Sequence, residues 1–68
     1  MMTLTELMGA MTVHMMHERG WSLEEAVAWV RVRTAEAREE YRQAGAPLGD
    51  TDEGFVAWLM PRYQPSAA

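Results

Sequence analysis

The stretch SLEEAVAWVRVRTAEAREEYRQA, residues 22–44, decides the fold of this chain. No glycine or proline interrupts it before Gly45. Ser22 and Glu25 have the spacing of a capping box, in which each side chain satisfies a backbone N–H at the start of a helix. We therefore predict a helix over residues 23–44, about 33 Å long at about 1.5 Å per residue. Its inward side chains recur at alternating spacings of four and three, which is typical of helices packed nearly (anti)parallel. They are Leu23, Val27, Val30, Thr34, Ala37, Tyr41 and Ala44.

A helix is also predicted before this stretch, over residues 4–18. Thr3 and Glu6 form a second capping box, and Gly20 is suited to end the helix because glycine adopts the left-handed conformation cheaply. Apolar side chains repeat here too, at Leu4, Met8, Met11 and Met15. The matching repeats predict an antiparallel hairpin of the two helices, joined by the short turn at Gly20.

A loop and a short third helix are predicted after the long helix. Glycine and proline within residues 45–49 favour a turn. Asp50 and Glu53 have the spacing of a third cap, which predicts a helix over residues 51–60. Pro61 is expected to end or kink it, since proline lacks the N–H of the helical hydrogen bond. The predicted fold class is therefore all-α.

The length of 68 residues allows one domain. We predict a single helical domain over residues 1–63 and a disordered tail over residues 64–68. A domain of this size buries only about 60% of its unfolded surface and is marginal alone. The chain has no cysteine, which excludes disulfides and cysteine-based zinc sites. A second copy or a larger partner is the stabiliser that remains.

The charge balance is ten acidic residues against six arginines, with a net charge of −4. Such a balance provides no broad attraction to nucleic acid. The use of arginine without lysine suggests a GC-rich bacterial or phage genome. No apolar run approaches the roughly 18 residues of a membrane span, and no basic segment precedes an apolar one as in a signal peptide. We expect a cytoplasmic protein.

Apolar side chains exceed what a hairpin and a short helix are expected to cover. A helix that is apolar on several faces is normally buried on several faces. The leading functional prediction is therefore a non-enzymatic helical interaction or regulatory module that forms a homodimer or binds a larger protein. The predicted partner interface consists of Met8, Met11, Val13, Met16, Trp29 and Val32.

An alternative prediction is an acidic antagonist of the phage-inhibitor or antitoxin kind. Such a protein would occupy the basic cleft of a larger, nucleic-acid-handling protein through a carboxylate patch. The acidic residues predicted to form that patch are Glu36, Glu39, Glu40, Asp50, Asp52 and Glu53.

A further alternative is a small DNA-binding regulator. Arg31, Arg38 and Arg42 lie on one stripe of the long helix and could contact phosphates. Residues 18–26 locally resemble the turn and cap of helix-turn-helix and MerR-type regulators. The resemblance covers nine residues, and no second helix with a basic N-terminus follows.

One group of residues has the character of metal ligands. His14 and His17 share a helix face, and Glu18 follows them. Zinc normally requires at least three such ligands, and the His-Glu-x-x-His spacing is absent. We therefore predict no metal, no cofactor and no catalytic residue, and expect the histidines to lie at the end of a helix.

Overall fold

The computed structural model describes residues 2–63 of the chain. It contains three helices: α1 (Leu4–Arg19), α2 (Leu23–Gln43) and α3 (Asp52–Tyr63). No strand occurs among these residues, so the predicted all-α class is confirmed. The predicted disordered tail at residues 64–68 lies outside the described residues.

The first two helices begin as their local sequence predicts. Thr3 and Glu6 exchange hydrogen bonds at the start of α1, and Ser22 and Glu25 do so at the start of α2. The pKa of both glutamates is lowered, first because each carboxylate accepts a backbone N–H at the cap. Gly20 ends α1 with a φ of 67°, in the left-handed region that favours glycine.

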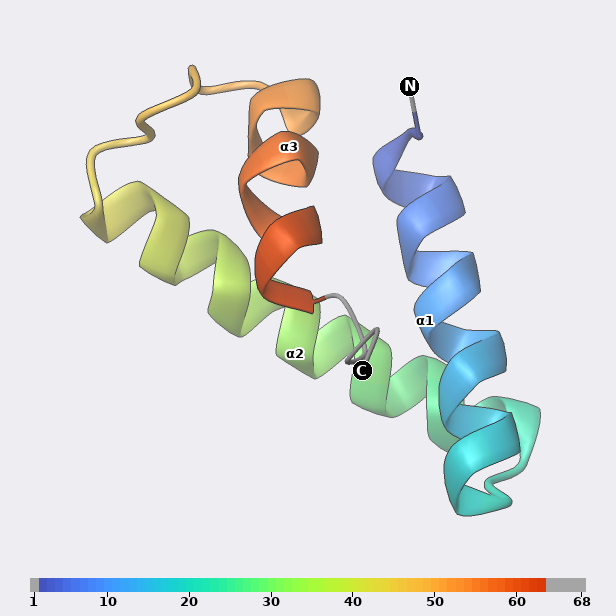
Figure 1. Ribbon diagram of the computed structural model, residues 1–68. Helices are drawn as coiled ribbons and strands as arrows, with labels where there is room; N and C mark the ends of the chain where they lie inside the picture. The colour runs from blue at the N-terminus through green and yellow to red at the C-terminus, as the bar shows by residue number, and fades with distance from the viewer. Residues whose placement is uncertain (1, 64–68) are drawn as a thin grey trace.

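The buried residues of α2 agree with the predicted seam at Val30, Thr34 and Tyr41 but not at its start. The two helices pack closely but splay apart from the turn at Gly20, so that they form a V (Figure 1). At the start of α2, Leu23 is 59% exposed, whereas Ala26 is fully buried. The buried row on α2 advances by four residues, from Ala26 to Val30 and Thr34. Such i, i+4 rows are typical of helices that cross at a steep angle.

The third helix begins and ends later than predicted. Its cap is Thr51, whose hydroxyl accepts the N–H of Gly54 at 3.0 Å, so the predicted cap at Asp50 is wrong. Aspartate and threonine are both favoured cap residues, and the loop geometry selects the threonine hydroxyl. The helix also continues through Pro61 to Tyr63. A proline in the last turn removes only one terminal hydrogen bond, which explains why the helix does not stop there.

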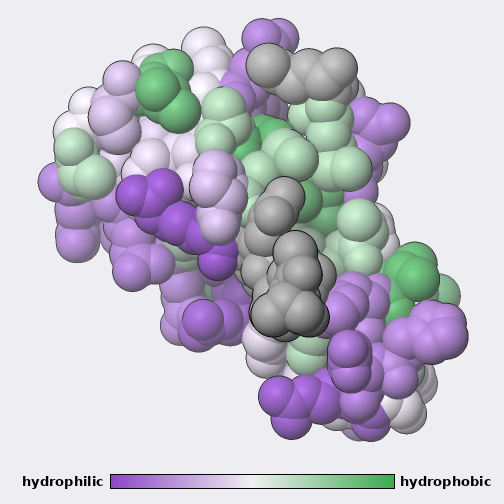
Figure 2. Space-filling view, in the orientation of Figure 1, coloured by the Kyte–Doolittle hydropathy of each residue, from purple (hydrophilic) through white to green (hydrophobic). Residues whose placement is uncertain are grey.

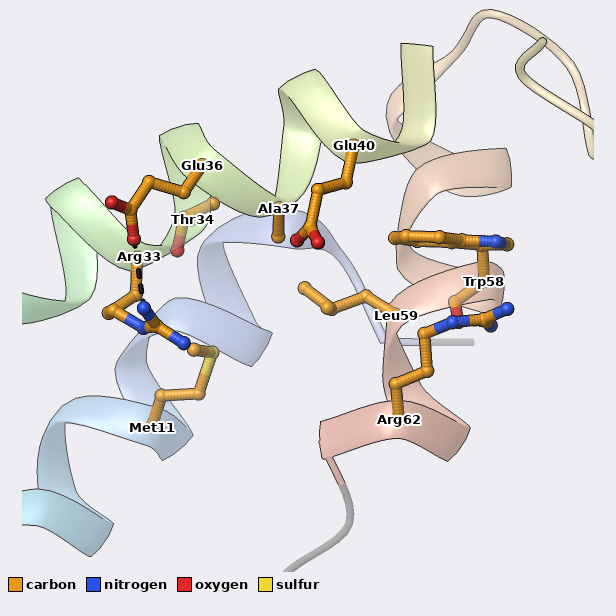
Figure 3. Close-up of a pocket in the computed structure, with 9 residues that line it drawn as sticks. All are labelled: Met11, Arg33, Thr34, Glu36, Ala37, Glu40, Trp58, Leu59 and Arg62. Atoms are coloured by element: carbon orange, nitrogen blue, oxygen red, sulfur yellow. Dashed lines mark hydrogen bonds and ion pairs between the residues drawn. The ribbon is translucent and has the colours of Figure 1, made fainter. Parts of the chain in front are cut away.

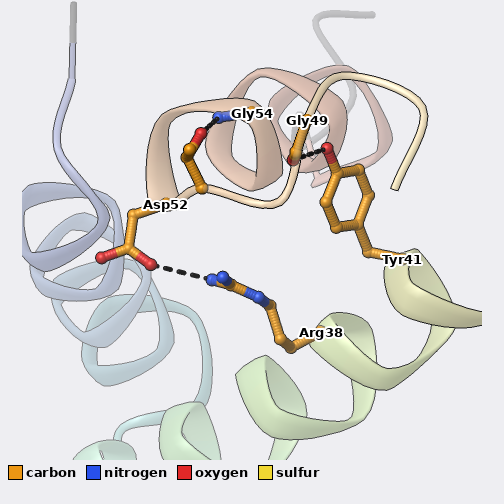
Figure 4. Close-up of polar contacts among 6 residues, drawn as sticks. Arg38, Tyr41, Gly49, Asp52 and Gly54 are labelled. Atoms are coloured by element: carbon orange, nitrogen blue, oxygen red, sulfur yellow. Dashed lines mark hydrogen bonds and ion pairs between the residues drawn. The ribbon is translucent and has the colours of Figure 1, made fainter. Parts of the chain in front are cut away.

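The third helix covers the far end of α2, inside the opening of the V (Figure 1). Tyr41 of α2 lies 5.6 Å from Phe55 and 5.2 Å from Trp58, measured between ring centroids. Beside these rings, Arg38 donates to Asp52 at 3.0 Å and joins the two helices by an ion pair (Figure 4). The aromatic cluster therefore supplies the cover that α1 is too short to provide.

The molecule is less compact than its length predicts. Its radius of gyration is 12.3 Å, against about 11 Å for a compact domain of this length. Figure 2 shows hydrophobic side chains down the middle of one face, where α3 approaches α1, and hydrophilic side chains over much of its lower part. In residues 2–63, every helix is too short or too polar to cross a lipid bilayer.

Candidate interaction surfaces

The outward face of α1 is uncharged over most of its length. No aspartate, glutamate, lysine or arginine occurs between Glu6 and Glu18. Val13, in the middle of this run, is 58% exposed. The residues that share its side of the helix are likewise exposed or half-buried. We call these residues the outer α1 face: Gly9, Ala10, Val13, Met16 and His17.

The structure does not bring the predicted partner-interface residues together. Met11 is 3% exposed and belongs to the core, and Met8 and Trp29 are half-buried against it. Val32 is 58% exposed but lies on the outward side of α2, among charged side chains. Since α1 and α2 pack against each other, the outward sides that carry Val13 and Val32 point in different directions. Val13 and Met16 alone remain on a common surface.

A cavity of about 560 Å³ opens where the three helices meet (Figure 3). Its volume lies in the usual range of ligand pockets. α1 contributes one buried methionine, α2 contributes small and charged side chains, and α3 contributes the far wall. The lining residues are Met11, Arg33, Thr34, Glu36, Ala37, Glu40, Trp58, Leu59 and Arg62. We call this space the α2–α3 cavity.

Both arginines of the α2–α3 cavity have contacts within the chain. Arg33 donates to Glu36 at 2.9 Å. The guanidinium of Arg62 lies 4.1 Å from the centre of the Trp58 ring and donates to the carbonyl oxygen of Trp58 at 2.8 Å. In contrast, the carboxylate of Glu40 has no cation within ion-pair distance among residues 2–63.

The predicted acidic patch is partly neutralised by arginines. Glu36, Asp52 and Glu39 are paired with Arg33, Arg38 and Arg42, at 2.9, 3.0 and 2.8 Å. The same pairs occupy Arg38 and Arg42 of the predicted phosphate-binding stripe. Exposed pairs of this kind contribute little to stability. They do reduce the electrostatic potential that the carboxylates or the arginines would otherwise create at the surface.

The two histidines of α1 remain without a third ligand. His14 is half-buried and His17 is exposed near the end of the helix. Within the part of the chain that the structure describes, no group of three or more histidine, cysteine, aspartate or glutamate side chains could hold a metal ion. The position of the histidines in and next to the last turn suits the negative end of the helix dipole.

Sequence patterns did not predict the α2–α3 cavity. Met11 and Glu40 were each predicted to lie on other surfaces, whereas Leu59 and Arg62 were not predicted to lie on any. The aromatic Trp58 four residues before Arg62 was the available signal, because an arginine one turn later can stack on an indole ring. Comparison of the chain with protein-family models, with characterised proteins and with solved structures finds no match.

Proposed function

We propose that the protein is a small, non-enzymatic helical interaction module whose first partner is a second copy of itself. The outer α1 face is the proposed interface. The observation that carries the proposal is the uncharged run between Glu6 and Glu18, with Val13 more than half exposed at its centre. A surface helix normally presents charged side chains to water, so an uncharged outward face is typical of a helix that packs against a partner.

An antiparallel pair of α1 helices suits this face. Two-fold symmetry places the same surface of each copy against the other. Centred between Met11 and Thr12, the pairing sets Val13 against the partner subunit's Ala10. The small side chains of Gly9 and Ala10 allow the helices to approach closely. The same register sets Glu6 beside the partner subunit's His17, which adds a polar contact at each end.

Several further features of the proposal rest on composition. The chain has no cysteine, and Ser22 is engaged as a helix cap, which supports a non-enzymatic role. The cytoplasm is the proposed compartment, because a cysteine-free chain is compatible with reducing conditions.

The acidic-antagonist alternative has less support than self-association, because Glu36, Glu39 and Asp52 are paired with arginines of the same chain.

Chemical cross-linking tests the proposed interface directly. Because the chain has no cysteine, a single Val13→Cys variant carries one unique thiol. A short thiol-specific cross-linker should convert this variant to covalent dimer. Glu24→Cys, at a residue that is also exposed but lies on α2, is the matched control and should remain monomeric. Equal cross-linking of the two variants would show random collision and would contradict the proposal.

A further inference from the structure

Glu40 is an exposed residue of α2 that lines the α2–α3 cavity. Figure 3 shows it pointing from α2 over the cavity, on the side of Leu59 and Ala37. Leu59 lies below it in Figure 3, whereas Met11 lies at the other end of the cavity beside Arg33, and both apolar side chains are largely buried. A negative group above an apolar side chain, without an ion-pair partner among residues 2–63, offers a site to a cation on an aliphatic stem.

A second polar group of the same wall lacks a partner. Thr34 is 8% exposed, and its Oγ1 has no hydrogen-bond partner among the described residues. A buried hydroxyl without a partner is costly, and one that lines a cavity is able to receive a ligand. A rotation of about 120° about the Cα–Cβ bond of Thr34 would move the hydroxyl to another staggered position without movement of the backbone, so a donor in the cavity could reach the oxygen.

We propose that the α2–α3 cavity binds the arginine side chain of a basic segment in a partner protein. The aliphatic part of that side chain lies over Leu59, and its guanidinium donates to the carboxylate of Glu40. A guanidinium has five N–H donors in a fixed plane, so it can donate to Glu40 and to Thr34 together. An ammonium group has no such fork, which favours arginine over lysine.

The charges around the cavity are consistent with this occupant. The chain carries a net charge of −4, which attracts a basic segment over long range. Arg33 is neutralised by Glu36 at 2.9 Å. Arg62 is held against Trp58, by stacking at 4.1 Å and by its hydrogen bond to the carbonyl oxygen, and so leaves Glu40 available. The cavity lies on the opposite side of α1 from Val13, so the inference does not depend on self-association.

A pair of blocked peptides tests the inference on the full chain. The probe is acetyl-Gly-Ala-Arg-Ala-Gly-amide, and its control carries citrulline, which has the same shape but no charge, in place of arginine. The readout is the indole N–H resonance of Trp58, which lines the cavity, with Trp21 at the α1–α2 turn as an internal reference. We expect saturable binding of the arginine peptide with a dissociation constant on the order of 1 mM, and binding of the citrulline peptide about fivefold weaker.

Matched variants assign the binding to the cavity. Glu40→Gln should weaken binding about fivefold, because it keeps the shape and removes the charge. Glu39→Gln makes the same change of charge one residue away, outside the cavity, and should leave binding unchanged. Thr34→Val should weaken binding to a smaller degree. Equal binding of the two peptides, equal losses in Glu39→Gln and Glu40→Gln, or equal movement of the Trp21 and Trp58 resonances would overturn the inference. The Val13→Glu variant should bind the arginine peptide as the native chain does, which separates this result from the proposed dimer.

Discussion

The hydroxyl of Tyr41 donates a 2.6 Å hydrogen bond to the carbonyl oxygen of Gly49 (Figure 4). The same hydroxyl accepts the backbone N–H of Leu48 at 3.1 Å. One side chain near the end of α2 therefore satisfies two backbone groups of the loop that leads to α3. Its ring also packs on Phe55 and Trp58. Tyr41 thus positions both the loop and the helix that forms the far wall of the α2–α3 cavity.

Removal of the Tyr41 hydroxyl should destabilise the fold. Tyr41→Phe keeps the ring contacts but leaves the carbonyl of Gly49 and the N–H of Leu48 without their partner. We expect a loss of about 1–3 kcal/mol in the free energy of unfolding, measured by urea denaturation. A variant as stable as the native chain would show that water replaces the hydroxyl at no cost.

Two glycines should respond in opposite directions to alanine. A Cβ on Gly54 would meet the backbone carbonyl oxygens of Leu48 and Gly49, whereas a Cβ on Gly9 meets open space. Backbone atoms cannot move aside as a side chain can, so Gly54→Ala should lower the unfolding free energy by more than about 1 kcal/mol, the gain in helix propensity notwithstanding.

Gly9→Ala is the matched control for that substitution. It should raise the unfolding free energy by about 0.5–1 kcal/mol, because alanine loses less backbone entropy in a helix. Both variants should be measured at concentrations where the chain is monomeric, since Gly9 lies on the outer α1 face. Destabilisation by both substitutions would contradict the open surroundings of Gly9.

The capping boxes predict a particular loss of stability in acid. The pKa of Glu25 is lowered below 4.5 because its carboxylate accepts the backbone N–H of Ser22. A group with a lowered folded pKa stabilises the fold above its unfolded pKa, and this contribution is lost as the pH falls through the folded value. The melting temperature should therefore fall as the pH falls below about 4.5.

Glu25→Gln should reduce that acid dependence, because an amide oxygen accepts the same hydrogen bond at every pH. Glu24→Gln removes a carboxylate from the same helical turn and leaves the exchange between Ser22 and Glu25 intact. Its melting temperature should follow the native pH profile. An unchanged profile in Glu25→Gln would assign the acid dependence to other carboxylates.

The proposed dimer predicts different effects at two exposed valines. Val13→Glu places a charge at the centre of the outer α1 face and should give a monomer with unchanged helix content by circular dichroism. Val32 is equally exposed, at 58%, but lies among charged residues on α2. Val32→Glu should therefore leave the solution mass unchanged. If both substitutions, or neither, dissociate the dimer, the outer α1 face is not the interface.

Local signals in the sequence predicted the first two helices well. A capping box joins residues that are three apart in the chain. The hydrogen bonds between Thr3 and Glu6, and between Ser22 and Glu25, therefore depend on little else in the fold. The prediction of the third cap was wrong because that cap depends on the fold of the loop before α3. Asp50 and Thr51 are both suitable caps, and the choice depends on how the loop returns to Tyr41.

Tertiary geometry limited the rest of the prediction. The splay of α1 and α2 (Figure 1) depends on the packing of both helices and is not visible in the periodicity of either. The α2–α3 cavity combines Met11, Glu40 and Leu59, one from each helix. No spacing rule connects residues so far apart in the chain, so neither the cavity nor the position of Glu40 over it could be predicted.

The solution mass at micromolar concentration tests the central proposal most directly. The chain has a mass of 7.7 kDa. Multi-angle light scattering during gel filtration, over a dilution series, should give twice this mass at the highest concentration and approach one chain on dilution. A mass of one chain at every concentration would contradict the proposal that the outer α1 face joins two copies of the protein.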